Sequence, residues 1–134
     1  MTREQTRAHE AYRRIGNVPK EEHKEYGGNC LRLPAMIHQC GLCQTLAFLQ
    51  AKGAKNPAFR RILDDLAGVT GLAASGDALA DATRAADLGR YQRFTREVLA
   101  GATYLKPGRT ELTEEARTPT RRSAPAASEK EIFQ

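Results

Sequence analysis

The sequence has no tryptophan, and aromatic residues make up only 6% of its 134 residues. A large ligand pocket lined by aromatic side chains is therefore not expected. Cysteine is also scarce. Three thiols are an odd number, which argues against a disulfide framework and is typical of a reducing compartment. We therefore expect a cytoplasmic protein that does not depend on disulfides.

Long hydrophobic runs are absent as well. The most apolar stretch, residues 33–49, is interrupted by His38, Gln39 and Gln44, whereas a membrane-spanning helix needs about 20 predominantly apolar residues. The first ten residues include two acidic side chains and lack the apolar core of a signal peptide. We expect neither a membrane partner nor a secretion signal.

Positive charge exceeds negative charge, with 21 Lys and Arg residues against 16 Asp and Glu and a formal net charge of +5. Residues 107–134 hold five basic and five acidic residues, so the whole excess lies in residues 1–106. The C-terminal segment opens with Pro107-Gly108 and has too little apolar surface to offset the entropy of ordering. We predict a helical domain over 1–106 and a mostly disordered tail over 107–134.

Apolar residues in the first 106 positions recur with the period of an α-helix, and no window alternates with the period of a strand. Thr2 and Gln5 have capping-box spacing, which predicts a first helix ending near Ile15. The same kind of signal predicts later helices that begin at Asn56-Pro57, that run over about 77–86 and that run over about 88–106. The fold class we predict is all-α, a compact bundle of five to seven helices.

A helix over residues 34–52 has the strongest pattern. Pro34 suits the first turn of a helix, and Gly27-Gly28 is expected to interrupt whatever precedes it. The stretch is apolar nearly all round, which is typical of the central, buried helix of a bundle. Gly41 within it suggests close approach by a neighbouring helix.

Cys40 and Cys43 form a Cys-x-x-Cys motif, which could be drawn as a zinc site with Cys30 and His38. A structural zinc site needs two converging pairs of ligands, and no second pair is present. We interpret the two cysteines as buried packing residues and expect neither a metal nor a cofactor. No nucleophile with a matching base is recognisable, so we expect no catalytic residues and no enzyme.

The remaining indication of function is the helical spacing of lysine and arginine residues on the predicted helices. Lysines and arginines spaced along a helix can follow a phosphate backbone, but they can equally form a solvated helix face or bind an acidic protein partner. The apolar stripes of the first and last helices must face one core, so their arginines are expected on a shared surface. The candidate nucleic-acid-binding residues are Arg3, Arg7, Arg14, Lys52, Arg90, Arg93 and Lys106.

Several motifs follow one another in the order of a known family. The most specific are Glu25-Tyr26-Gly27, Leu33-Pro34-Ala35-Met36-Ile37 and Gly41-Leu42-Cys43-Gln44-Thr45-Leu46-Ala47-Phe48-Leu49. The flanking helices contribute weaker matches at Gln5, Arg7, Ala8, Tyr12, Tyr91, Thr95, Glu97, Leu99 and Tyr104-Leu105-Lys106. Over residues 3–106 the chain resembles the small subunit of the type III-B CRISPR effector complex, the Cmr complex.

This resemblance implies a small all-helical, non-catalytic subunit. Several copies of the chain would stack along the backbone subunits that hold the CRISPR RNA, with basic faces toward the guide–target RNA, in antiviral defence. The implied partners are the other subunits of the complex, further copies of the chain, the CRISPR RNA and the target RNA. The alternative that composition leaves open is a generic helical interaction module that binds an acidic partner.

Two features depart from the family pattern. Cys40 and Cys43 stand where the family usually has a small or polar residue. After Lys106 the family continues its last helix, whereas Pro107-Gly108 is expected to end the helix in this chain.

Overall fold

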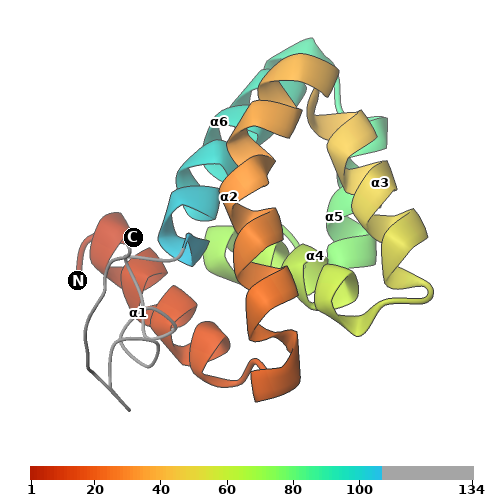
Figure 1. Ribbon diagram of the computed structural model, residues 1–134. Coiled ribbons are helices and arrows are strands. Elements are labelled where there is room, and N and C mark those ends of the chain that lie inside the picture. The colour runs from red at the N-terminus through yellow and green to blue at the C-terminus, as the bar shows by residue number, and fades with distance from the viewer. Residues whose placement is uncertain (107–134) are drawn as a thin grey trace.

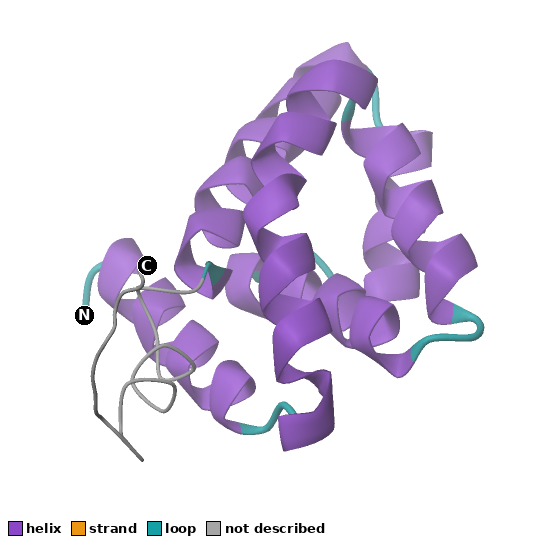
Figure 2. Cartoon of the chain, in the orientation of Figure 1, coloured by secondary structure: helices purple, strands orange, loops and turns teal. Residues whose placement is uncertain are grey.

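The computed structural model describes residues 1–106, and these residues form six α-helices and one short 3-10 helix, with no strand among them (Figures 1 and 2). The all-α prediction is confirmed, while the predicted tail at 107–134 lies outside the described residues. Within the described part, no helix has the length and apolar composition needed to cross a bilayer. The elements are α1 (Arg3–Gly16), η1 (Lys20–Glu22), α2 (His23–Cys40), α3 (Leu42–Gly53), α4 (Pro57–Thr70), α5 (Gly76–Ala85) and α6 (Leu88–Leu105).

Helix α4 is the centre of the domain, because it packs against all five other helices. Its start is as predicted: Asn56 Oδ1 accepts a hydrogen bond from the backbone N–H of Ala58, and Pro57 occupies the first turn. Gly71, in the left-handed conformation at φ 71°, ends it. The prediction that residues 34–52 form the central helix was therefore wrong.

Gly41 divides that predicted helix in two. Its φ of 85° and ψ of 163° end α2 and begin α3, so the chain turns back on itself at this point (Figure 1). The Cys43 backbone N–H, which has no partner within α3, donates to Tyr91 Oη of α6 at 3.1 Å. The neighbouring helix expected at Gly41 is thus α6, but its approach accompanies a break in the helix.

Helix α2 begins earlier than the sequence suggested. Gly27-Gly28 lies within it, and Pro34 lies inside it instead of in its first turn. Tyr26 and Cys30, both fully buried, anchor this earlier part of the helix in the core. Burial of these side chains outweighs the weak helix propensity of the glycines.

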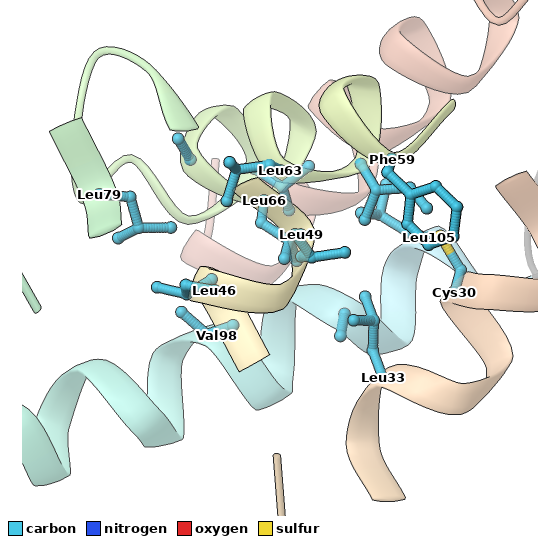
Figure 3. Packing of buried hydrophobic residues seen from close by; sticks show 14 of the residues in the cluster. Cys30, Leu33, Leu46, Leu49, Phe59, Leu63, Leu66, Leu79, Val98 and Leu105 are labelled. Carbon is cyan, nitrogen blue, oxygen red and sulfur yellow. The ribbon is translucent and has the colours of Figure 1, made fainter. Parts of the chain in front are cut away.

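All six helices contribute to one hydrophobic core. Leu46 and Leu49 of α3 lie against Leu63 and Leu66 of α4, and Val98 of α6 completes this part of the cluster (Figure 3). These side chains are almost completely buried.

Only one cysteine belongs to this core. Cys30 is buried, which raises the pKa of its thiol well above the ordinary value. Cys40 is exposed and Cys43 is half-buried. The interpretation of the Cys-x-x-Cys pair as buried packing residues was wrong for Cys40, because the break at Gly41 places that side chain at the exposed end of α2.

Substitution of Gly41 by alanine should destabilise the domain. The backbone conformation at Gly41 strains any L-residue, and an added Cβ would lie 3.2 Å from Tyr91 Oη. The free energy of unfolding, measured with urea, should fall by roughly 1–3 kcal/mol. Gly28→Ala is the matched control, because a Cβ there meets nothing within 4 Å, and it should raise stability by up to about 1 kcal/mol. Equal effects of the two substitutions would contradict this account of the turn.

Candidate nucleic-acid interface

Helix α1 packs across α4 and α6 at one end of the domain (Figure 1). The predicted capping box starts it: the Gln5 backbone N–H donates to Thr2 Oγ1 at 3.1 Å, and the Thr2 N–H donates to Gln5 Oε1 at 2.8 Å. Ala11 and Ile15 are the buried residues of α1. Two charged attachments to other helices accompany this apolar contact.

Arg14 forms the first charged attachment. Its Nη1 donates to Asp65 Oδ1 at 3.0 Å, and Tyr26 Oη donates to Asp65 Oδ2 at 2.5 Å. Asp65 is only 4% exposed. Burial raises the pKa of this carboxyl group, although the hydrogen bonds from Tyr26 and Arg14 oppose the shift. Arg14 reaches Asp65 over Gly68, where an added Cβ would collide with the Arg14 guanidinium group.

Two features of this network depend on contacts between helices. Asp65 follows Arg61 by four residues, the spacing of an ion pair along one helix, but Arg61 instead bonds to Glu22 at 2.9 Å. Tyr26 is completely buried, so its ring is not available to stack on a base. Because α4 has neighbours on several sides, even the polar Asp65 is buried, while its other polar positions are half-buried.

Glu97 of α6 forms the second attachment. Arg7 donates to Glu97 Oε1, and Arg3 Nη1 donates to Glu97 Oε2 at 3.2 Å. The Arg7 side chain is 11% exposed and the Arg3 side chain 73% exposed. Burial lowers the pKa of Arg7, and the adjacent positive charge of Arg3 lowers it further. One carboxylate thus holds two guanidinium groups from successive turns of α1.

A groove between α1 and α6 brings together arginines from the first and the last helix of the domain. Residues 70–72, at and just after the end of α4, also line it. Glu97 is the only acidic side chain that lines it among the described residues. Of the seven candidates, Arg3, Arg7 and Arg93 meet here, and Arg96 joins them. The basic lining residues are therefore Arg3, Arg7, Arg93 and Arg96.

The other four candidates do not line this groove. Arg14 is directed to Asp65, as described above. Arg90 lies on α6 and stacks its guanidinium 5.5 Å from the centre of the Phe94 ring. Lys106 directly follows the last residue of α6. Lys52 lies on α3, with its amine 5.8 Å from the centre of the Phe48 ring.

The described residues contain no group of three or more His, Cys, Asp and Glu side chains placed to hold a metal ion. The lining of the groove offers four guanidinium groups and one carboxylate. Guanidinium groups bind phosphate and carboxylate oxygens in bidentate fashion. The lining therefore suits an anionic group such as a phosphate or a carboxylate.

The two kinds of arginine should differ in their effect on stability. Arg14→Met removes a hydrogen bond and a counter-charge from buried Asp65, so urea unfolding should show a loss of roughly 1–3 kcal/mol. Arg93→Met, the matched control in the groove, should change the free energy of unfolding by no more than about 0.5 kcal/mol. A larger loss for Arg93→Met than for Arg14→Met would mean that the assignment is reversed.

The comparisons with known proteins agree with the resemblance found in the sequence. A family model described as CRISPR-associated protein (Cas_Cmr5) matches residues 3–107. The CRISPR system Cmr subunit Cmr5 of Thermus thermophilus is 40% identical over 115 residues, which cover 85% of this chain and 98% of the relative. The crystal structure of a CRISPR-associated Cmr5 family protein, also from Thermus thermophilus, matches with a TM-score of 0.74 and 37% identity, over 86% of this chain and 96% of that one. The chain belongs to the Cmr5 family of CRISPR-associated proteins.

Proposed function

We propose that this protein is a non-catalytic structural subunit of a Cmr effector complex, and that it contacts RNA through the groove between α1 and α6. Membership of the Cmr5 family and the name of the Thermus relative support the first part. The second part rests on one observation, the convergence of arginines from α1 and α6 on a single groove. In such a complex the chain would stack along the backbone subunits, beside further copies of itself, and act in RNA-guided antiviral defence in the cytoplasm.

The candidate arginines divide between two roles. Arg7 and Arg14 have half-buried or buried side chains engaged with carboxylates, and their role is to hold α1 in place. Arg3 is exposed enough to reach a phosphate, and Arg93 and Arg96 line the groove with no carboxylate partner among the described residues. Arg3, Arg93 and Arg96 are therefore the proposed phosphate-binding residues.

The remaining candidates extend this surface or lie outside it. Arg90 lies one helical turn before Arg93, and Lys106 follows the other end of α6. Both can continue a phosphate path along that helix. Lys52, on α3, would have to contact a different segment of RNA or a neighbouring subunit.

Binding through this groove should be weak for a single copy and independent of sequence. Guanidinium contacts to phosphate carry no base information, and Tyr26, one of the few aromatic residues, is buried. Three arginines provide only a handful of phosphate contacts. Tight retention of RNA would come from several copies acting along one strand, because linked weak sites act at high effective concentration.

Reversal of the groove charge tests the proposal. The double variant Arg93→Glu/Arg96→Glu should bind a labelled single-stranded RNA oligonucleotide at least roughly tenfold more weakly than the wild type at low salt. It should also join guide-loaded Cmr complexes less well. Arg84→Glu on α5, which makes a charge change of the same kind away from the groove, should alter the affinity by less than about twofold. Circular dichroism melting should establish that all variants remain folded.

The same titration separates RNA from an acidic protein partner. Counterion release predicts a steep, linear fall of log affinity for RNA with log salt concentration. Unchanged RNA binding and unchanged assembly by a folded Arg93→Glu/Arg96→Glu variant would contradict the proposed interface. Strong binding of an acidic protein in place of RNA would favour the interaction-module alternative.

A further inference from the structure

We propose that Glu97 is an internal competitor of RNA, a carboxylate that occupies the arginines of the groove and thereby limits the affinity of each copy for phosphate. The inference rests on the proposed function, since it concerns the same groove. It assigns to Glu97 a role in setting affinity, in addition to its role in holding α1.

The geometry places Glu97 where a phosphate would bind. Each of its carboxylate oxygens accepts a hydrogen bond from a different arginine, Oε1 from Arg7 and Oε2 from Arg3. Two anionic oxygens between two guanidinium groups reproduce the contacts that a phosphodiester group makes with an arginine pair. A phosphate that enters the groove therefore meets donors that are already engaged.

The two bonds differ in how easily they can be exchanged. The Arg7 side chain is 11% exposed, so its release would leave a largely buried charge without a partner. The Arg3 side chain is 73% exposed and can turn from the carboxylate to a phosphate while staying hydrated. Arg3 is thus the exchangeable arginine, and Glu97 both retains it and repels the incoming phosphate.

The charges that line the groove support competition between Glu97 and phosphate, because Glu97 alone does not neutralise the arginines. Four arginines line the groove against the single carboxylate of Glu97, so an excess of positive charge remains for an external anion. Burial lowers the pKa of Arg7, and the adjacent positive charge of Arg3 lowers it further, so the two cations repel each other across the groove. A phosphate would relieve this repulsion by taking over Arg3.

Glu97→Gln tests the competition, because the amide keeps the size of the side chain and an acceptor for Arg7 but removes the negative charge. Affinity for labelled single-stranded RNA should rise by roughly three- to tenfold at low salt. The slope of log affinity against log salt should steepen by about 0.7, the value for one additional phosphate contact to a single strand. The melting temperature should fall at the same time, because Arg7 loses its counter-charge.

Two further variants make the result decisive. Asp81→Asn on α5 removes a negative charge outside the groove, and its affinity for RNA should change by less than about twofold. If Glu97→Gln alone does not fold, the comparison is repeated in an Arg7→Met background, which leaves no buried guanidinium without a partner. There, Glu97→Gln should raise the affinity by a similar factor.

The outcomes separate this inference from the function on which it rests. If Arg93→Glu/Arg96→Glu weakens RNA binding but Glu97→Gln does not strengthen it in either background, the groove binds RNA and Glu97 is not a competitor. A gain equal to that of Asp81→Asn would also overturn the inference, since net charge would explain it. If neither the arginines nor Glu97 affects RNA binding, the proposed interface itself fails.

Discussion

The position of α1 depends on two arginine–carboxylate attachments, and the groove exists only because α1 is held in this position. Arg7 bonds to Glu97 on α6, and Arg14, two helical turns later, bonds to Asp65 on α4. Ala11 and Ile15 bury one side of α1 in the core, and the two directional pairs on different partner helices add a constraint on its register and rotation. That placement brings Arg3 beside the arginines of α6.

The rest of the bundle supports this arrangement through α4. Because α4 contacts every other helix, it can present Asp65 to α1 near its middle and line the groove with residues 70–72 at and just after its end. The break at Gly41 allows α2 and α3 to pack on α4 as two separate helices. Helix α4 therefore supports both the core and the placement of α1 beside α6, and changes in α4 should affect both.

Local features of the fold could be predicted from the sequence, and non-local ones could not. The capping box at Thr2 and the Asn56-Pro57 start depend on neighbouring residues, and both are confirmed. The sequence also predicted that arginines of the first and last helices share a surface. It could not separate structural from exposed arginines, because Arg14 and Arg7 meet carboxylates 51 and 90 residues away. The break at Gly41 was missed because the apolar pattern continues through it.

The central claim is that RNA lies along the α1–α6 groove when the chain is part of a Cmr complex. Photo-cross-linking with RNA that contains 4-thiouridine, followed by mass spectrometry, tests it directly in a complex reconstituted on guide and target RNA. The account predicts cross-linked peptides from the first turns of α1 and from α6 around Arg93–Glu97. Cross-links confined to α3 and α5, with none in α1 or α6, would contradict it.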